Sequence, residues 1–338
     1  MAARRFIRAM RIHGHGGPEV LQLEEIELPP PGPGEVRIRH TAVALNFSDI
    51  NVRRGGFYAA RPIVFPIVLG NEGAGVVVAV GEGVAEWQPG DRIAYVGSGG
   101  PFYENTGAYA DERTLPARVL VRLPRGVHER TAAAILLKGL TASMVVNRCY
   151  RPRPGETVLV HAAASGVGLL LVQWAKHLGA TVIGTVGSAA KAALARARGC
   201  DHVVPYRETD FVAAVRSLAP QGVHAVLDGV GRDTFERSLD VVRPFGILVN
   251  YGNASGHPAP IDLLTLANKG SLFVVRPGFH THIAHPGDLA RYSEELFDLV
   301  QRGVLKADIA RTYPLTEAAQ AHRDVESRAL AGAAVLIP

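Results

Sequence analysis

From Gly155 onward, short apolar segments alternate with alanine-rich amphipathic stretches, and this order constrains the fold more than any other feature of the sequence. The apolar runs have the length of buried strands, and the stretches between them have helical periodicity. Strands that are joined by helices in this way pair in parallel through right-handed crossovers. The sequence therefore predicts an α/β domain built on a doubly wound parallel sheet.

The elements of this domain are predicted from the apolar runs and from a glycine that follows the first helix. Strands are expected at 157–162, 181–186, 202–206, 225–227, 247–251 and 271–275. Helices are expected at 167–178, 189–198, 210–218 and 234–242. Gly179 stands where a helix ends in a left-handed conformation, so the first helix is expected to stop there.

The N-terminal third differs in composition and in hydrophobic pattern, and it predicts a second domain. It is rich in Gly and Pro, with short alternating segments such as 36–40 and a β-branched run at 75–80. These features predict an irregular, mainly antiparallel β domain. A helix at 289–301 and a strand at 334–337 are expected to return to it. We therefore expect residues 1–134 and 272–338 to form this domain, and residues 135–271 to form the parallel one.

Charge and apolar content restrict the class of protein. The formal net charge is +5, but the Lys and Arg residues are scattered, which predicts a solvated surface and makes nucleic acid a disfavoured partner. No apolar run approaches the roughly 20 residues that cross a bilayer. We expect a cytoplasmic protein; a remnant of a targeting signal and a start at Met10 are the alternatives for the basic N-terminus. Cys149 and Cys200 lie too far apart for a CxxC motif.

The segment 157–168, TVLVHAAASGVG, is a buried-strand pattern that leads through small residues directly into a helix. The unpaired N–H groups and the positive dipole end of such a helix suit a pyrophosphate. Gly166 and Gly168 are the glycines of a degenerate G-x-G-x-x-G pattern, in which Ala163 replaces the first. A tight turn with no ligand is the alternative. The candidate cofactor contacts in this turn are Ala163, Ser165, Gly166, Val167 and Gly168.

The residues after the second and third strands indicate which dinucleotide would bind. An NAD site usually has an acidic residue there to bond the ribose 2′-hydroxyl, but residues 169–200 contain no Asp or Glu. Ser188 and Lys191 follow the second strand, and Tyr206 follows the third. An ammonium and hydroxyl groups favour a 2′-phosphate, so NADPH is the predicted cofactor. The alternative is that Lys191 is a solvated helix residue.

Over essentially its whole length the chain resembles the zinc-independent quinone oxidoreductase branch, the zeta-crystallin-like proteins, of the medium-chain dehydrogenase/reductase superfamily. Several sequence blocks in the same order carry the resemblance: HGGPEVL at 15–21, LNFSD at 45–49, GNEGAGVV at 70–77, LKGLTA at 137–142, HAAASGVG at 161–168 and VGRDTFERSLD at 230–240. The resemblance implies a GroES-like fold for the antiparallel domain, a Rossmann fold for the parallel domain, and a homodimer.

The resemblance also bears on metal binding. Zinc-dependent members of the superfamily carry Cys in the block that corresponds to LNFSD and His in the block that corresponds to GNEG. This chain has Asn46 and Asn71 at those positions and Lys138 near the third ligand position. Amide and ammonium groups are poor zinc ligands, so no metal site is expected. Glu72 is interpreted as a structural residue.

For catalysis, the resemblance implies a cleft between the domains, in which hydride passes from the nicotinamide to a quinone near Asn46 and Thr141. Asn46 would hydrogen-bond the nicotinamide or a substrate oxygen; a turn-capping amide is the alternative. Thr141 is expected in a loop that leads to a helix. Asp49 is interpreted as orienting the loop of Asn46 rather than acting as an acid. Tyr58 would relay a proton or pack against substrate.

Val230, Gly252 and Asn253 complete the predicted cofactor contacts by resemblance. Two residues depart from the quinone reductases, since Asn51 replaces a common Tyr and Ser165 replaces a common Gly. The predicted function is NADPH-dependent, metal-free quinone reduction. The alternatives are a zinc-free reductase of the carbon–carbon double bond of an enone or acyl thioester and, disfavoured, a nucleic-acid-binding protein that keeps the cofactor.

Overall fold

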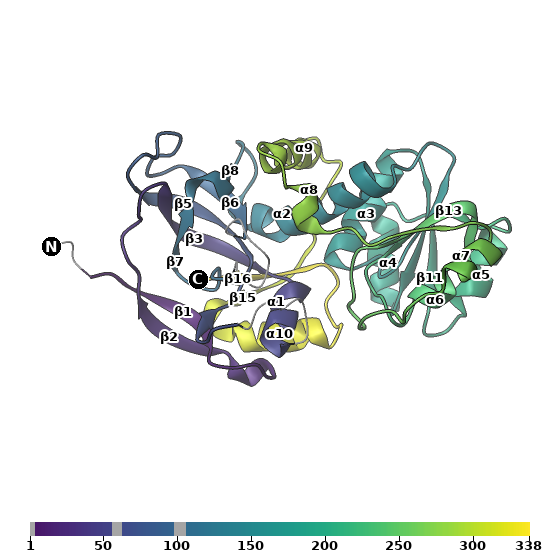
Figure 1. Ribbon diagram of the computed structural model, residues 1–338, viewed down its shortest axis with the longest axis horizontal. Helices are drawn as coiled ribbons and strands as arrows, with labels where there is room; N and C mark the ends of the chain where they lie inside the picture. Colours follow the sequence, from purple (N-terminus) through teal and green to yellow (C-terminus); the bar gives the residue numbers. More distant parts are fainter. Residues whose placement is uncertain (1–3, 56–62, 98–105) are drawn as a thin grey trace. The chain divides into compact units, whose positions relative to one another are not determined.

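The computed structural model describes residues 4–55, 63–97 and 106–338. The chain forms two compact units (Figure 1). Unit 1 comprises Met1–Leu137, Leu289–Phe297 and Ala307–Pro338, and unit 2 comprises Lys138–Asp288 and Asp298–Lys306.

The described part of unit 1 contains two sheets. The larger has the order β15-β16-β3-β5-β6-β8, with β7 also paired to β3, and the smaller has the order β2-β1-β4. The pairings are antiparallel except that of β15 with β16, so the predicted mainly antiparallel domain is confirmed. The strands are β1 (Phe6–Ile12), β2 (Gln22–Glu27), β3 (Glu35–Leu45), β4 (Ile67–Val68), β5 (Glu72–Val80), β6 (Arg92–Val96), β7 (Glu112–Pro116), β8 (Leu120–Arg122), β15 (Ile309–Pro314) and β16 (Ala333–Ile337).

Unit 2 contains a parallel sheet with the strand order β11-β10-β9-β12-β13-β14. The chain moves outward from β9 to β11 and then returns past β9 to β12, so the strand order reverses between β9 and β12 as in a Rossmann sheet. The predicted doubly wound sheet is confirmed. The strands are β9 (Thr157–Val160), β10 (Thr181–Val186), β11 (His202–Pro205), β12 (Val223–Asp228), β13 (Val242–Asn250) and β14 (Phe273–Val275).

Helices of unit 2 follow the strands as the alternation predicts. Helix α3 packs against β9 and β10, α4 against β10 and β11, and α5 against β11. Gly179 has φ of 86°, the left-handed conformation expected after the first helix. The helices are α3 (Gly166–His177), α4 (Ala189–Ala197), α5 (Phe211–Leu218), α6 (Phe235–Ser238), α7 (Leu263–Asn268) and α8 (Phe279–His282).

Several predicted bounds differ from the structure, and two of these differences change how the elements are assigned. The helix expected at 234–242 is the short α6, because β13 begins at Val242 and pairs with β12 from Val223 across a register shift. Residues 272–288 lie in unit 2, whereas the predicted boundary precedes them. The reason is that β14 pairs in parallel with β13 and extends the same sheet.

The remaining helical elements belong to unit 1 or span the two units in sequence, except Val145–Cys149, which lies in unit 2. They are α1 (Phe47–Arg54), α2 (Glu129–Met144), α9 (Asp288–Gln301), α10 (Ala318–Glu326) and the short turns Pro18–Val20, Ala117–Val119, Val145–Cys149 and Leu315–Glu317. By length and composition alone, the stretch Glu129–Cys149 could cross a membrane. Since 78% of its apolar window is buried inside the structure, it is typical of a core helix.

Candidate functional site

In unit 1, Asn46 lies between strand β3 and helix α1 and is held from two sides. Its backbone N–H donates to Asp49 Oδ2 at 2.8 Å, and its side-chain Nδ2 donates to Glu72 Oε1 at 3.0 Å. The other oxygen of Glu72 accepts the backbone N–H of Leu137 at 2.6 Å. All three side chains, those of Asn46, Asp49 and Glu72, are buried. The orientation of the Asn46 amide is therefore fixed by a buried carboxylate.

Asp49 is fully buried and accepts hydrogen bonds from three separate segments of unit 1. Besides the Asn46 backbone, Asn71 Nδ2 donates to its Oδ1 at 2.5 Å, and the Tyr109 hydroxyl donates to its Oδ2 at 3.3 Å. A buried carboxylate is costly unless such donors satisfy it. Asp49 therefore fastens the start of α1 to the segments that carry Asn71 and Tyr109.

The hydrogen bonds that join Arg53, His322 and Tyr109 allow only one assignment of donors and acceptors. The Arg53 guanidinium can only donate, so His322 Nδ1, 3.0 Å from Arg53 Nη1, is an acceptor and the proton of the ring is on Nε2. His322 Nε2 then donates to the Tyr109 oxygen at 3.1 Å, and the hydroxyl is left to donate to Asp49. Burial, followed by the charge of Arg53, lowers the pKa of His322 to about 3, which keeps the ring neutral.

A second buried Tyr–His pair, His40 and Tyr95, lies against Gly73. His40 Nδ1 is 2.7 Å from the Ala110 carbonyl, so it carries the proton, and Nε2 accepts the Tyr95 hydroxyl at 2.7 Å. Burial lowers the pKa of His40 to about 4. A Cβ on Gly73 would lie 2.9 Å from the His40 ring, so the glycine leaves room for this pair. The hydrogen bonds described for His40 and Tyr95 do not connect this pair to Asp49.

In unit 2, the turn after β9 has the features of a phosphate loop. Ala162 has φ of 50°, and Ser165 caps α3 by accepting the N–H of Gly168 at 3.1 Å. A Cβ on Gly168 would collide with the Ala162 carbonyl, so only glycine fits there. Ala163 replaces the first glycine of the pattern because β10 supplies Gly184 opposite it, where a Cβ would lie 2.7 Å from the Ala163 methyl group.

A buried histidine supports this turn from behind. Ser238 donates to the Thr234 carbonyl, so it accepts from His161 Nε2 at 2.9 Å, and Nδ1 accepts the Thr185 hydroxyl at 2.9 Å. The Thr185 oxygen in turn accepts the Ala162 N–H at 3.3 Å. Burial lowers the pKa of His161, consistent with the neutral ring that this order requires. The conformation of the turn is thus tied to β10 and α6.

Ser188, Lys191 and Tyr206 come together where β10 and β11 end. Ser188 caps α4 by accepting the backbone N–H of Lys191 at 3.4 Å. The Tyr206 hydroxyl lies against Gly187, where a Cβ would be 2.7 Å from its oxygen. Because β10 and β11 are parallel neighbours, these residues lie at the same edge of the sheet as the turn after β9.

The loops after β12 and β13 are joined by Asp228, which sequence reasoning did not single out. Its buried carboxylate accepts the Val230 N–H at 2.8 Å and the Thr234 hydroxyl at 3.0 Å. Ala254 N–H donates to the Gly229 carbonyl, and a Cβ on Gly252 would lie 2.7 Å from that carbonyl oxygen. The two loops therefore pack backbone to backbone. The signal in the sequence is an acidic residue that ends a predicted apolar strand.

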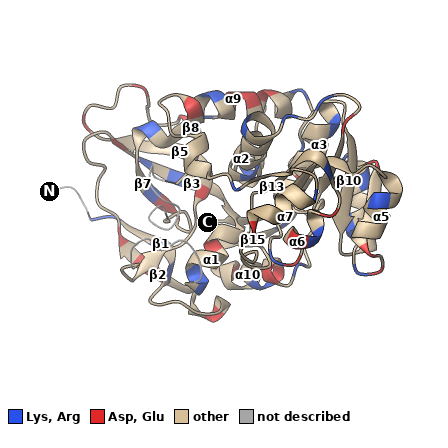
Figure 2. Ribbon diagram, turned by 45° about the vertical axis from the view of Figure 1, so that its right-hand side comes forward, with Lys and Arg blue, Asp and Glu red and all other residues tan. Residues whose placement is uncertain are grey.

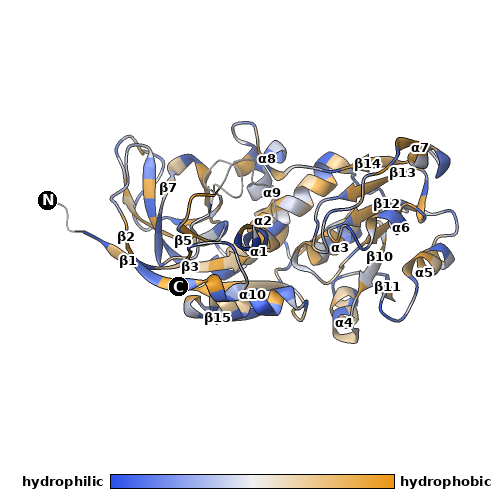
Figure 3. Ribbon diagram, turned by 60° about the horizontal axis from the view of Figure 1, so that its bottom comes forward, coloured by the Kyte–Doolittle hydropathy of each residue, from blue (hydrophilic) through white to orange (hydrophobic). Residues whose placement is uncertain are grey.

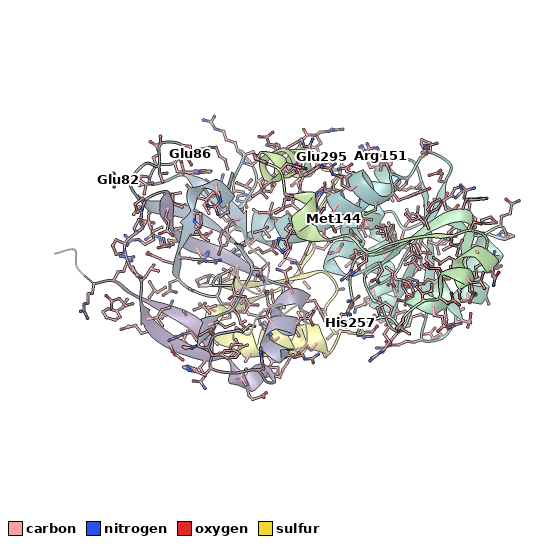
Figure 4. All side chains as sticks on the ribbon, in the orientation of Figure 1. Glu82, Glu86, Met144, Arg151, His257 and Glu295 are labelled. Carbon is pink, nitrogen blue, oxygen red and sulfur yellow. The ribbon has the colours of Figure 1, made fainter. Side chains whose placement is uncertain are left out.

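Asn253 lies in the second of these loops. Its Nδ2 is 3.2 Å from His257 Nδ1, and His257 is labelled in Figure 4. Its Oδ1 is buried and has no hydrogen-bond partner within the described residues. An unsatisfied buried carbonyl costs stability, so this oxygen is suited to receive a donor from a ligand.

The chain was compared with known proteins. Residues 32–125 match the alcohol dehydrogenase GroES-like domain family, and residues 166–280 match the zinc-binding dehydrogenase family. The chain is 42% identical over 332 residues to a quinone oxidoreductase of Pseudomonas aeruginosa, covering 98% of this chain and 99% of the relative. It is 40% identical over 339 residues to a 2-haloacrylate reductase of a Burkholderia species, covering 98% and 99%.

A solved structure of Escherichia coli quinone oxidoreductase in complex with NADPH matches with a TM-score of 0.92. It is 41% identical, and the match covers 98% of this chain and 100% of that one. The chain belongs to the quinone oxidoreductase family. It is therefore an oxidoreductase of the medium-chain dehydrogenase/reductase superfamily, and the resemblance seen in the sequence is confirmed.

Within this family fold, the structure places the predicted residues in separate parts. Asn46 and Asp49 are in direct contact in unit 1. The cofactor candidates at 163–168, together with Ser188, Lys191, Tyr206, Val230, Gly252 and Asn253, follow the carboxyl ends of parallel strands in unit 2. Thr141 was expected in a loop but lies within α2, because the helix continues to Met144. Tyr58 lies outside the described residues.

Residues 4–55, 63–97 and 106–338 contain no group of three or more His, Cys, Asp or Glu side chains that could hold a metal ion. The amides of Asn46 and Asn71 donate to Glu72 and Asp49, so their nitrogens face carboxylates instead of a cation. Lys138 packs its stem over the start of α3, where a Cβ on Gly166 would lie 2.7 Å from Lys138 Cδ.

The two neutral histidines of unit 1 predict acid sensitivity. Since burial lowers the pKa of His40 and His322 below 6.5, the unfolded chain binds more protons than the folded one as the pH falls below that value. Stability is therefore complete near pH 7 and is lost progressively toward pH 4, by about 3 kcal/mol for His40 alone. We expect the Tm to fall over this range, and to fall less steeply in His40→Gln.

The control for this measurement is His285→Gln, since His285 is exposed. This variant should keep the wild-type dependence of Tm on pH. A Tm in His40→Gln that falls as steeply as in the wild type would contradict the assignment of a neutral buried His40.

Proposed function

We propose that the chain reduces quinones with NADPH and without a metal ion. The observation that carries this proposal is the turn after β9, where Ser165 and Gly168 shape the N-terminus of the 12-residue helix α3 into an anion-binding cradle. The Escherichia coli relative crystallised with NADPH supports the choice of cofactor. So does the absence of Asp and Glu from residues 169–200, because a carboxylate there would repel a 2′-phosphate.

The residues of unit 2 fit such a cofactor along its length. We propose that the backbone of residues 163–168 binds the pyrophosphate and that Ser188, Lys191 and Tyr206 bind the 2′-phosphate. Val230 and Gly252 border the packed loops after β12 and β13, where side chains are small and backbone is close. The buried, unpartnered Oδ1 of Asn253 suits a donor from the nicotinamide half.

The reaction consumes one NADPH, one proton and one quinone and gives NADP⁺ and a hydroquinone. When bound, NADPH supplies the hydride. The side chains of the protein position the partners: we propose that Asn46, held by Glu72, orients the nicotinamide or the acceptor oxygen, and that Thr141 on α2 contributes a hydroxyl. Asp49, with its three donors, orients the Asn46 loop rather than transferring a proton. For Tyr58 we keep both proposed roles, to relay a proton or to pack against the substrate.

The donors present support the proposal of metal-free chemistry. Asn46 and Asn71 stand where zinc ligands would be needed, and both amide nitrogens donate to carboxylates. Without a Lewis acid, a simple ketone would be a poor acceptor, whereas a quinone is already electrophilic. We therefore propose an electrophilic acceptor that needs no metal activation.

A second candidate function is reduction of an activated carbon–carbon double bond. It is favoured by the Burkholderia relative, a 2-haloacrylate reductase that is 40% identical. Both reactions use the same cofactor residues and differ in the acceptor. Nucleic-acid binding stays disfavoured, because the Lys and Arg residues are interspersed with Asp and Glu over both units (Figure 2).

The acceptor is tested by steady-state oxidation of NADPH with a panel of quinones, enones and 2-haloacrylates, compared by kcat/KM. We expect quinones to give the highest kcat/KM, and we expect the activity to survive dialysis against EDTA. A higher kcat/KM for enones or haloacrylates would select the second candidate. Loss of activity on chelation, with recovery on adding Zn²⁺, would overturn the metal-free proposal.

The cofactor preference is tested by Lys191→Glu. Because the new carboxylate would repel the 2′-phosphate but not a 2′-hydroxyl, we expect KM for NADPH to rise at least tenfold while KM for NADH changes little. Arg196→Glu makes the same change of charge on an exposed position of the same helix and should leave both KM values near those of the wild type. Equal losses with both cofactors in Lys191→Glu would contradict the assignment.

We also propose a cytoplasmic homodimer that pairs through unit 2. Strand β14 is an edge of the described parallel sheet, and exposed apolar side chains flank it: Phe245, Leu263, Leu264 and Phe273. Figure 3 shows α7 beside β13 and β14 at this edge. A second copy of β14, related by a twofold axis, would pair the open backbone groups and cover the apolar side chains.

This dimer is tested by Phe273→Lys. Phe273 is 58% exposed, so the charge is tolerated by the monomer but opposes burial in an interface. We expect light scattering to report a dimer for the wild type and a monomer for the variant. Phe6→Lys is the matched control, since Phe6 is 53% exposed on β1 of unit 1, and it should stay dimeric. A variant that stays dimeric would place the interface elsewhere.

A further inference from the structure

Unit 1 contains a buried relay, which we define as Arg53, His322, Tyr109 and Asp49, and of these residues the proposed function uses Asp49 alone. Each member donates to the next: Arg53 to His322 at 3.0 Å, His322 to Tyr109 at 3.1 Å, and Tyr109 to Asp49 at 3.3 Å. The relay joins the C-terminal helix α10 to the first turn of α1, 269 residues apart between Arg53 and His322.

We propose that His322 is a positioning residue for hydride transfer, acting through Tyr109 and Asp49 on Asn46. The proposal rests on the proposed function, since Asn46 must contact the cofactor or the acceptor for its position to affect turnover. His322 itself lies on α10 and reaches Asn46 only through the other members of the relay.

The start of the relay is rigid because a buried cation fixes it. The Arg53 side chain has no exposed area and is bound by the Gly16 carbonyl, by His322 and by the carboxylate of Glu326. A buried guanidinium is costly unless its donors are satisfied, so removing one acceptor disturbs the whole group. His322 is thereby held in the neutral form that accepts at Nδ1 and donates at Nε2.

The middle of the relay is fixed by the backbone. Gly70 has φ of 96°, and a Cβ at this position would collide with the Tyr109 ring. The ring therefore packs directly on the backbone next to Asn71, and its hydroxyl has two neighbours, His322 Nε2 and Asp49 Oδ2. With His322 as donor, the hydroxyl proton must point to Asp49. Without that donor, the hydroxyl is free to turn away.

The end of the relay is the group that fixes Asn46. Asp49 Oδ2 accepts both the Tyr109 hydroxyl and the Asn46 backbone N–H, while Oδ1 accepts Asn71. Loss of the Tyr109 donor leaves a buried carboxylate with fewer hydrogen bonds, and the loop of Asn46 then shifts to compensate. A shift of about 1 Å in a positioning group lowers turnover by up to about a hundredfold.

The pair His40 and Tyr95 supplies a comparison within the same unit. It has the same residue types and is also buried, and it flanks the same Gly70–Gly73 block. Tyr95 donates to His40, and His40 donates to the Ala110 carbonyl, so this order of donors leads to a backbone carbonyl instead of to Asp49. If buried Tyr–His pairs served stability alone, the two pairs would behave alike.

The experiment measures kcat and KM for NADPH in His322→Leu, Tyr109→Phe and the double variant. We expect each single variant to lose about tenfold in kcat with KM for NADPH little changed, since the proposed contacts to the cofactor's phosphate groups are in unit 2. We expect the double variant to lose no more than either single variant, because both changes remove the same donor to Asp49. His322→Gln, whose amide can accept from Arg53 and donate to Tyr109, should recover most of kcat.

Tyr95→Phe is the matched control. It should lower the Tm as Tyr109→Phe does, keep the wild-type kcat, and leave the tenfold loss of His322→Leu unchanged when the two are combined. Losses of His322→Leu and Tyr109→Phe that multiply, or an equal loss of kcat in Tyr95→Phe, would overturn the positioning role while the wild type remains active. A wild type that turns over no acceptor with NADPH would overturn the proposed function itself, and the positioning role with it.

Discussion

The buried carboxylate of Asp49 is the group on which the arrangement of unit 1 depends. It receives an N–H from the start of α1, an amide from Asn71 and a hydroxyl from Tyr109, so three segments that are remote in sequence meet at two oxygens. A charge with no exposed area stabilises a structure only when its hydrogen-bond donors are in place. The positions of the residues that supply these donors are therefore closely restricted. Asn46, the residue at the centre of the proposed chemistry, is fixed by this group on one side and by Glu72 on the other.

Unit 2 reaches the same kind of rigidity with neutral groups behind the turn after β9 and with a second buried carboxylate between two later loops. His161, Thr185 and Ser238 form an ordered set of hydrogen bonds behind the turn after β9, and Asp228 joins the loops after β12 and β13. Close contacts between backbone segments also restrict the conformation of this turn. Gly168 lets the first turn of α3 approach the Ala162 carbonyl. The outcome is a sheet edge whose backbone N–H groups and small side chains are preorganised for a phosphate-bearing ligand.

Periodicity was enough to predict the parallel domain, because its strands and helices are regular and each buries one apolar face. Strand β10 has the predicted bounds, and Gly179 ends the first helix as expected. Periodicity failed where pairing decides the bounds: β13 starts earlier because it follows β12 across a register shift. Thr141 was misplaced because helix α2 continues past the glycine that precedes it.

The relay from Arg53 to Asp49 was beyond sequence reasoning. His322 stands in a polar helix with no motif around it, and its partners are 213 and 269 residues away. In the sequence, Ala163 in place of the first loop glycine only weakens the match to the G-x-G-x-x-G pattern. Only the parallel pairing of β9 with β10 places Gly184 against it and restores the space.

The central claim is that this chain passes hydride directly from NADPH to an electrophilic acceptor, using only its own side chains to position the two. The most direct measurement is a single turnover in stopped flow, with excess enzyme, saturating quinone, and NADPH deuterated at one or the other face of C4. We expect NADPH oxidation to be slower for one of the two labelled forms and unchanged for the other, because a bound nicotinamide presents a single face to the acceptor. Equal rates for both labelled forms and unlabelled NADPH would contradict direct hydride transfer at an ordered site.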